Sequence, residues 1–360
     1  ASGELKTKPT QHSVKELRSL GIGPDVLVCR SEQELPKEEK RKIALFCSVP
    51  KDNVISMHDV DTVYSIPILL NKQKVDEIIL KKLKVKTKKP NLNDWKRVVK
   101  SKLLPEKEVN VSFVGKYTEL KDSYKSINEA LEHAGIQNKA KVNINFVEAE
   151  EITSKNVKKI LKNADAILVP GGFGERGVEG MIFACKFARE NNTPYLGICL
   201  GMQVAIIEYA RNVLKLKAAN STEFDPTTKF PVIGLITEWN DMSGKKEKRH
   251  KNSDLGGTMR LGGQICKLKK SSNSHKMYKT NKIVERHRHR YEVNPKYKDQ
   301  MIKMGLDVVG TSIDDKLVEM IEIPKHKWFL ACQFHPEFTS NPRDGHPIFN
   351  SYIKSTITKK

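Results

Sequence analysis

The middle of the chain alternates short apolar runs with segments in which apolar residues recur every three or four positions. The runs predict strands at residues 109–114, 142–147, 166–169 and 195–198. The periodic segments predict helices at 123–134, from 154, at 178–190 and at 202–211. Regular strand–helix alternation is typical of an α/β fold with a doubly wound, mostly parallel sheet, whose ligands bind at the carboxyl ends of the strands.

The two ends of the chain follow other patterns. Near the N-terminus, helices at 14–20, 38–46 and 75–83 and a strand at 26–30 predict a partial α/β domain. The segment Ser13-Val-Lys-Glu16 matches a capping box, which predicts the start of the first helix. The last third is richer in strands, predicted at 232–237, 283–291, 306–310, 318–323 and 329–334 before a helix from Ile348.

A basic stretch separates these regions. Residues 81–108 hold eleven Lys or Arg against three acids and include Pro90 and Pro105. We therefore expect a linker there, between a partial domain at 1–80 and a larger domain at 109–360. Since the sequence opens with Ala1 in the middle of a pattern, we expect it to be a piece of a longer protein.

Amino-acid composition excludes several classes of protein. Of 360 residues, 64 are Lys or Arg and 43 are Asp or Glu, a net charge of +21, but the lysines are dispersed and do not form a specific nucleic-acid site. A hydrophobic share of 38% excludes a disordered chain. No apolar stretch could cross a membrane, and no secretory signal opens the sequence, which indicates a cytoplasmic protein. The six cysteines contain no C-x-x-C pair, so neither a disulfide framework nor a zinc site is expected.

The segment Gly197-Ile-Cys199-Leu-Gly201 lies between a predicted strand and a predicted helix. It fits a sharp turn that presents a nucleophile, with the helix N-terminus favouring the thiolate. A buried structural cysteine between small residues is an equally good interpretation of this segment alone.

Two further features favour the nucleophile. The segment Gln333-Phe-His335-Pro-Glu337 follows an apolar strand and offers a base with an acid to orient it, although a surface histidine beside an acid is the usual interpretation of H-x-E. The segment Pro170-Gly-Gly-Phe-Gly174 could present backbone N–H groups to an oxyanion or form a plain turn. Together the three features indicate a thiol-based catalytic site.

These motifs resemble those of a known protein family. Gly197-Ile-Cys199-Leu-Gly-Met-Gln203 with His335-Pro-Glu337 resembles the class I glutamine amidotransferases. A closer similarity to CTP synthases rests on further blocks along most of the chain: Lys6-Thr-Lys-Pro-Thr-Gln11, residues 171–180, Asn220-Ser-Thr-Glu223, residues 253–260 and Glu285-Arg-His-Arg-His-Arg290.

This resemblance implies roles for individual residues. Cys199 would attack glutamine, His335 would transfer protons and Glu337 would orient His335. Backbone groups of Gly172 and Leu200 would hold the oxyanion. Glutamine would be bound by Gly172, Leu200, Gly201, Met202, Gln203, Glu223 and Arg290. The ammonia would aminate UTP that ATP has activated, which yields CTP.

The resemblance also implies nucleotide contacts and partners. UTP or CTP would be bound by Lys6, Thr7, Lys8, Pro9, Thr10, Gln11 and Lys42, and ATP by Val60. ATP with Mg²⁺ would serve the full-length enzyme, GTP would activate it, and the protein would form a homotetramer or filament without a prosthetic group. The basic residues 245–251 fit a GTP-associated lid or a solvated loop. We expect no metal site, because His287 and His289 offer too few ligands.

One departure limits the expected activity. The family's phosphate-binding loop lies upstream of the block at Lys6, and no G-x-x-x-x-G-K-[ST] motif occurs in this sequence. We therefore expect the chain as given to be at most a glutaminase. One alternative is a glutaminase that serves another biosynthetic synthase, but it would not explain the block Lys6–Gln11. A second alternative is a non-catalytic assembly module, but the presence of Cys199, His335 and Glu337 together argues against it.

Overall fold

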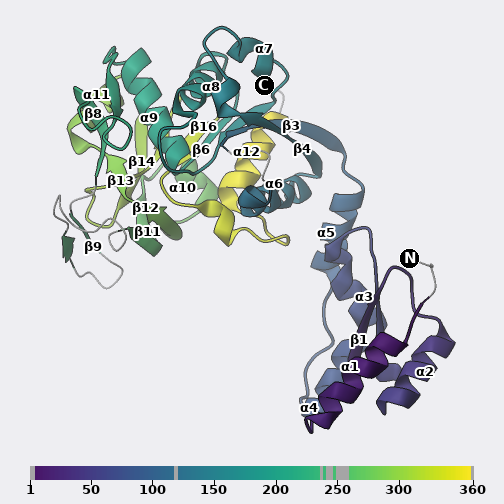
Figure 1. The fold of residues 1–360 in the computed structure, drawn as a ribbon. Coiled ribbons are helices and arrows are strands. Elements are labelled where there is room, and N and C mark those ends of the chain that lie inside the picture. The colour runs from purple at the N-terminus through teal and green to yellow at the C-terminus, as the bar shows by residue number, and fades with distance from the viewer. Residues whose placement is uncertain (1–4, 117–120, 236–237, 241–245, 249–258, 358–360) are drawn as a thin grey trace. The chain divides into compact units, whose positions relative to one another are not determined.

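The computed structural model describes residues 5–116, 121–235, 238–240, 246–248 and 259–357. It divides into two compact units, Ala1–Leu104 and Pro105–Lys360 (Figure 1). No helix among the described residues is long and apolar enough to span a membrane.

The N-terminal unit is a small α/β unit. Its strands β1 and β2 pair in parallel, with Leu27 opposite Val54. Its core is small, and Ile43, Cys47 and Val54 are its most buried members. The elements are α1 (Lys8–Ser19), β1 (Leu27–Ser31), α2 (Lys37–Cys47), η1 (Lys51–Asn53), β2 (Val54–His58), η2 (Val63–Ser65), α3 (Ile66–Lys72), α4 (Val75–Leu83) and α5 (Asn93–Leu103).

The first helix begins earlier than the capping box predicts. Helix α1 starts at Lys8, with Thr7 before it and Pro9 in its first turn, where proline costs no hydrogen bond. Ser13 therefore lies inside the helix, and its hydroxyl donates to the Pro9 carbonyl at 3.0 Å. The prediction of a helix start at Ser13 is wrong because the Ser-x-x-Glu pattern is internal.

The basic segment 81–108 is more structured than a linker. Helix α4 ends at Leu83 and α5 occupies Asn93–Leu103. The boundary between the two units along the chain falls after Leu104. Helix α5 buries Val98 completely against neighbouring elements of the N-terminal unit, including η2 and α3. Its charges lie on the other face, which is why composition alone does not reveal the helix.

The C-terminal unit is built on a mixed sheet. Among the described residues, nine strands lie in the order β12-β11-β14-β15-β16-β6-β5-β3-β4. The five from β16 to β4 are parallel to their neighbours, and the pairs from β12 to β16 are antiparallel. The strands are β3 (Lys107–Gly115), β4 (Ala140–Glu148), β5 (Ala166–Val169), β6 (Tyr195–Ile198), β11 (Arg260–Leu268), β12 (Lys282–His289), β14 (Asp307–Ser312), β15 (Val318–Glu322) and β16 (Phe329–Cys332).

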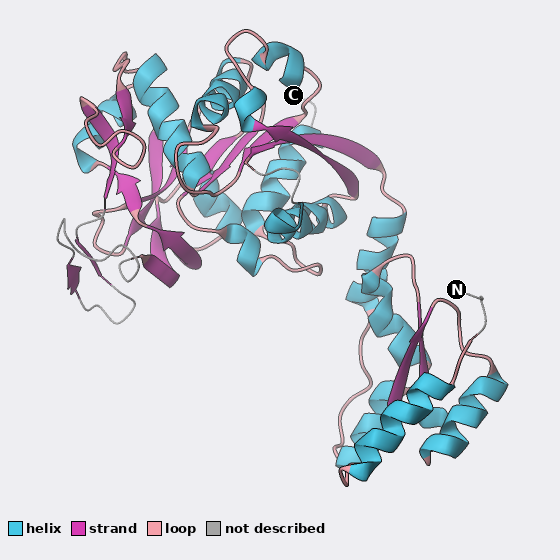
Figure 2. Ribbon diagram, viewed as in Figure 1, coloured by secondary structure: helices cyan, strands magenta, loops and turns pink. Residues whose placement is uncertain are grey.

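Helices cover both faces of this sheet (Figure 2). Ile167 and Val169 of β5 join a core with α8 (Val178–Glu190) and α9 (Leu200–Asn212). Leu168 faces the opposite core with α6 (Lys125–Gln137) and α12 (Pro347–Ile357). Burial on both faces explains the continuous apolar runs of the parallel strands and confirms the predicted doubly wound α/β architecture.

Smaller elements surround the sheet. Strands β7 (Ala219–Ser221), β8 (Phe230–Leu235) and β13 (Tyr291–Val293) form a second sheet. The others are η3 (Lys121–Tyr124), η4 (Ala149–Glu151), α7 (Val157–Leu161), β9 (Glu238–Asn240), β10 (Lys246–Lys248), α10 (Asn273–Tyr278), η5 (Pro295–Tyr297), α11 (Lys298–Lys303) and η6 (Pro336–Thr339). Most of the basic segment 245–251 lies outside the described residues.

The predicted strand at 283–291 is two strands. Strand β12 ends at His289 and β13 begins at Tyr291 in the other sheet, so the chain changes sheets at Arg290. Along β12, His287 and His289 are buried, whereas Arg286 and Arg288 are exposed. This alternation places the two histidines on one side of β12 and Arg286 and Arg288 on the other.

Candidate active site

Cys199 occupies a sharp turn between β6 and α9. Its φ and ψ are 53° and −101°, a conformation that a residue with a Cβ rarely adopts. Its backbone N–H donates to the Cys332 carbonyl at 2.7 Å, which ties the turn to β16. The predicted strand–turn–helix presentation of the sulfur is therefore observed.

The two glycines beside Cys199 are required by close backbone contacts. A Cβ on Gly197 would lie 2.6 Å from the Gly201 carbonyl oxygen, and a Cβ on Gly201 would lie 2.1 Å from the Val169 carbonyl oxygen. Neither distance is sterically possible without movement of the backbone. The G-x-C-x-G pattern thus reflects packing of α9 against β5 and β6.

His335 and Glu337 form the second part of the site. His335 lies beyond the end of β16, and its backbone N–H donates to the Arg286 carbonyl at 2.8 Å. Its Nδ1 is 2.7 Å from Glu337 Oε1, and the Glu337 side chain is buried. This bond leaves Nε2 of the imidazole as the nitrogen available to the sulfur.

The surroundings of His335 favour its protonated form. Burial lowers its pKa, but hydrogen bonds to Cys199 and Glu337 and the charges of these two groups outweigh burial and raise the pKa of His335 to about 10. His335 is therefore an imidazolium at neutral pH, and this positive charge lies beside the Cys199 sulfur.

A cavity of about 210 Å³ opens onto these groups. Cys199, His335 and Glu337 form part of its wall together with Gly171 and Gly172. The remaining wall consists of Ser123, Tyr124, Ser126, Ile127, Phe173, Arg288 and Phe338. A small amide substrate would thus reach the sulfur and the imidazole from one side.

Comparisons with known proteins identify the family of the chain. The family model for class-I glutamine amidotransferases matches residues 119–355, and the model for the CTP synthase N-terminus matches residues 1–85. The solved glutaminase domain of Trypanosoma brucei CTPS, with bound acivicin, is 39% identical and has a TM-score of 0.63. That match covers 70% of this chain and 95% of the other. The chain belongs to the CTP synthase family. A glutamine amidotransferase from Thermotoga maritima also matches, at 11% identity and a TM-score of 0.37, over 69% of this chain and 96% of the other.

The residues predicted from the sequence to bind glutamine come from separate segments of the chain. Gly172 lines the cavity, and the backbone of Leu200, Gly201, Met202 and Gln203 forms the buried first turn of α9. Leu200 is the first residue of that helix, so its N–H has no acceptor within the helix and is available to an oxyanion.

Glu223 and Arg290 do not line the cavity in the described part of the chain. Glu223 Oε1 accepts from the Gly174 N–H at 2.8 Å, which joins it to the loop after β5. Arg290 lies between β12 and β13, next to Tyr291, whose carbonyl accepts from Gln203 Nε2 at 3.2 Å. Glu223 is thus hydrogen-bonded to the loop that follows β5, and Arg290 precedes a residue that is hydrogen-bonded to α9.

Three further residues contribute to the site without an individual role predicted from sequence, although Gly171 and Gln333 belong to motifs that the sequence singles out. A Cβ on Gly171 would lie 2.8 Å from the His335 ring, so the glycine permits the ring's position. Lys116 Nζ donates to the carbonyls of Phe173 and Gly174, and burial lowers its pKa. Gln333 Nε2 lies 3.7 Å from Cys199 Sγ. Gly171 and Gln333 carry a sequence signal because they belong to the glycine-rich and histidine motifs, whereas Lys116 lies in no motif.

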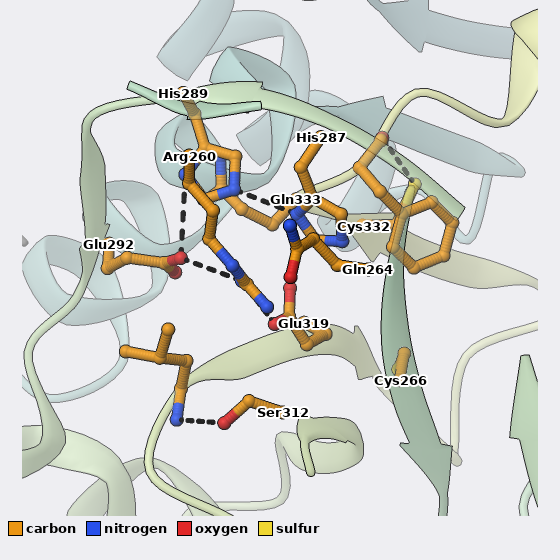
Figure 3. Close-up of polar contacts among 12 residues, drawn as sticks. Arg260, Gln264, Cys266, His287, His289, Glu292, Ser312, Glu319, Cys332 and Gln333 are labelled. Atoms are coloured by element: carbon orange, nitrogen blue, oxygen red, sulfur yellow. Dashed lines mark hydrogen bonds and ion pairs between the residues drawn. The ribbon is translucent and has the colours of Figure 1, made fainter. Parts of the chain in front are cut away.

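A buried ionic network joins residues of β11, β12, β13 and β15 (Figure 3). Arg260 contacts Glu319 and, at 3.4 Å, Glu292, while His287 Nδ1 lies 2.9 Å from His289 Nε2. Burial lowers the pKa of both histidines well below the usual value, which keeps them neutral. Ligand atoms of His287, His289 and Glu319 lie within 4.8 Å of one another, but Arg260 already supplies the positive charge that balances the carboxylate.

The residues predicted to bind nucleotides lie in the N-terminal unit. Lys6, Lys8 and Lys42 are exposed, and Val60 lies in the loop after β2. Thr7, which precedes α1, is buried and accepts from Gln11 Nε2 at 3.1 Å. Pro9 and Thr10 lie in the first turn of α1, which packs against α2, the helix that carries Lys42.

Proposed function

We propose that the chain hydrolyses glutamine through Cys199, His335 and Glu337, and that the ammonia serves the ATP-dependent amination of UTP to CTP in an enzyme that also carries a phosphate-binding loop. The observation that carries the first half is the pairing of His335 with Glu337 at 2.7 Å beside a cysteine on a strained turn. Membership of the CTP synthase family supports the second half.

The first step forms a thioester. The thiolate of Cys199 attacks the carboxamide carbon of glutamine, and the N–H groups of Gly172 and Leu200 stabilise the oxyanion. The imidazolium of His335 then gives its proton to the leaving nitrogen, which departs as ammonia. The product of this step is a γ-glutamyl thioester with a neutral imidazole.

The second step restores the enzyme. Neutral His335 accepts a proton from water as the water oxygen attacks the thioester carbon. The sulfur leaves as thiolate, glutamate is released and the thiolate–imidazolium pair is regenerated. Glu337 holds the proton on Nδ1 throughout, so that Nε2 faces the reacting atoms.

The amination half draws on the N-terminal unit. UTP or CTP would contact residues 6–11 and Lys42, and ATP, as its Mg²⁺ complex, would contact Val60. Activation by GTP, a homotetramer and a cytoplasmic site of action belong to the same proposal. Because no G-x-x-x-x-G-K-[ST] motif occurs in the 360 residues, we expect this chain to release ammonia without forming CTP.

A glutaminase that serves another synthase is the second candidate. The match of residues 1–85 to the CTP synthase N-terminus favours CTP formation over that candidate. The discriminating ligand is UTP: substitution of Lys6 and Lys42 by Ala should weaken UTP binding, whereas substitution of exposed Lys86 and Lys88 should not.

Acid quenching during turnover tests the proposed chemistry. We expect mass spectrometry to find a γ-glutamyl group on the peptide that carries Cys199, and the same peptide to stay unmodified when glutamate replaces glutamine. A glutaminase reaction at full rate with no adduct at Cys199 would contradict the mechanism.

A further inference from the structure

A buried glutamine lies beside the proposed nucleophile. Gln333 is fully buried between the end of β16 and His335. Its backbone N–H donates to the Glu319 carbonyl at 2.9 Å, which fixes the main chain at this position. Its side-chain Nε2 lies 3.7 Å from Cys199 Sγ, within the range of a hydrogen bond to sulfur.

A chain of contacts fixes which end of the Gln333 amide faces the sulfur. The carbonyl of Tyr291 can only accept, so the group of Gln203 that lies 3.2 Å from it must be the NH₂. That NH₂ also lies 3.5 Å from the other end of the Gln333 amide, which must then be Oε1. The Gln333 NH₂ is consequently the end that faces Cys199.

We propose that Gln333 is a second hydrogen-bond donor to the Cys199 sulfur, beside His335, and that it stabilises the thiolate that attacks glutamine. This rests on the proposed role of Cys199 as nucleophile. A thiolate accepts a hydrogen bond much more strongly than a neutral thiol does, so a fixed donor favours ionisation. Because the donor carries no charge, it does not compete with His335 for a proton.

The other groups near the sulfur have distinct roles. His335, held by Glu337, exchanges the catalytic proton. The Cys332 thiol lies close by, and burial raises its pKa well above the usual value, so it stays neutral. Arg288 lines the cavity but lies on the exposed face of β12. Gln333 is thus an uncharged donor that directly contacts the reacting atom.

Alkylation of Cys199 by iodoacetamide, followed at the peptide level across a pH series, tests the inference. In this reaction the thiolate displaces iodide, so the rate follows the ionised fraction. Gln333→Leu and Gln333→Met remove the donor and keep a side chain of similar size, and Met adapts to irregular space. Gln264→Leu is the matched control, because Gln264, labelled in Figure 3, is also buried but donates to the Leu261 carbonyl and not to Cys199.

We expect the pH at which alkylation reaches half its limiting rate to move up by about 0.5–1 unit in both Gln333 variants, which slows alkylation about three- to tenfold at pH values below that midpoint and leaves the limiting rate at high pH unchanged. The Gln264→Leu protein should follow the parent. A pH profile like that of the parent in a folded Gln333 variant would overturn the inference. If Gln333→Leu does not fold, the profile of Gln333→Met provides the test. Ammonia release by Cys199→Ala protein separately tests the nucleophile, so the two hypotheses fail independently.

Discussion

At the scale of single residues, the turn at Cys199 depends on what its neighbours lack. A methyl group at Gly201 would lie 2.1 Å from the Val169 carbonyl oxygen, a backbone atom that cannot move without disturbing β5. We therefore expect Gly201→Ala to lower the free energy of unfolding by about 1–3 kcal/mol and to displace the sulfur. Urea denaturation measures the first effect and glutaminase activity the second.

Gly234 of β8 provides the control for this prediction. A Cβ at Gly234 would meet no atom within 4 Å, and its backbone φ lies in the ordinary range. Gly234→Ala should consequently change stability by about 0.5 kcal/mol or less. Equal losses in the two variants would show that loss of glycine, and not the close contact, is responsible.

His335 makes stability depend on pH. Its pKa is about 10 in the folded chain and about 6.5 when unfolded, so the folded state binds the proton more tightly. The stabilisation is complete below about pH 6.5, declines as the pH rises and is lost above about 10. The free energy of unfolding should therefore fall more steeply between pH 7 and 10 in the parent than in His335→Gln protein. Parallel curves would contradict the proposed ion pair.

Part of the site is readable from sequence and part is not. Cys199, His335 and Glu337 occur in short motifs whose chemistry is local. Lys116 is 57 residues before Phe173, whose carbonyl accepts its hydrogen bond, and only the adjacency of β3 and β5 brings the two together. Contacts of that kind depend on sheet order, which no local pattern encodes.

At the scale of elements, two ion pairs join α8 and α9 with very different burial. Glu208 is fully buried and accepts two hydrogen bonds from Arg189, at 2.7 and 2.8 Å. Glu179, which pairs with Arg211, has 62% of its side chain exposed. Glu208→Ala removes the buried partner of the Arg189 guanidinium and leaves it with the longer contact to the half-exposed Glu190 at 3.3 Å, so it should cost about 3 kcal/mol or more.

Glu179→Ala removes the matched, exposed pair and should cost about 1 kcal/mol at most. Chemical denaturation of both variants under one set of conditions provides the comparison. Similar losses would mean that burial of the pair does not determine its contribution.

The predicted elements succeed where apolar periodicity is strong. The strands at 166–169 and 195–198 and the helix at 178–190 match the structure at both ends. The helix in the basic segment 81–108 is harder to predict, because α5 has few apolar residues on one face and many lysines elsewhere. Strand β11 (Arg260–Leu268) was missed since its glycines and polar residues hide the alternation that its neighbours impose.

At the scale of the whole molecule, each unit has its own core. We expect residues 105–360 expressed alone to fold and to release ammonia from glutamine within about threefold of the full chain. Circular dichroism and an ammonia assay measure the two properties. A folded fragment without activity would mean that the site needs residues of the N-terminal unit.

The proposed glutaminase chemistry depends on one sulfur, that of Cys199. The most direct measurement is the rate of ammonia release from glutamine by the 360-residue chain and its Cys199→Ala variant, with Cys29→Ala as a thiol control from the N-terminal unit. The account predicts that Cys199→Ala lowers the rate by about a thousandfold or more while Cys29→Ala leaves it unchanged. Equal rates in the parent and the Cys199→Ala protein would contradict it.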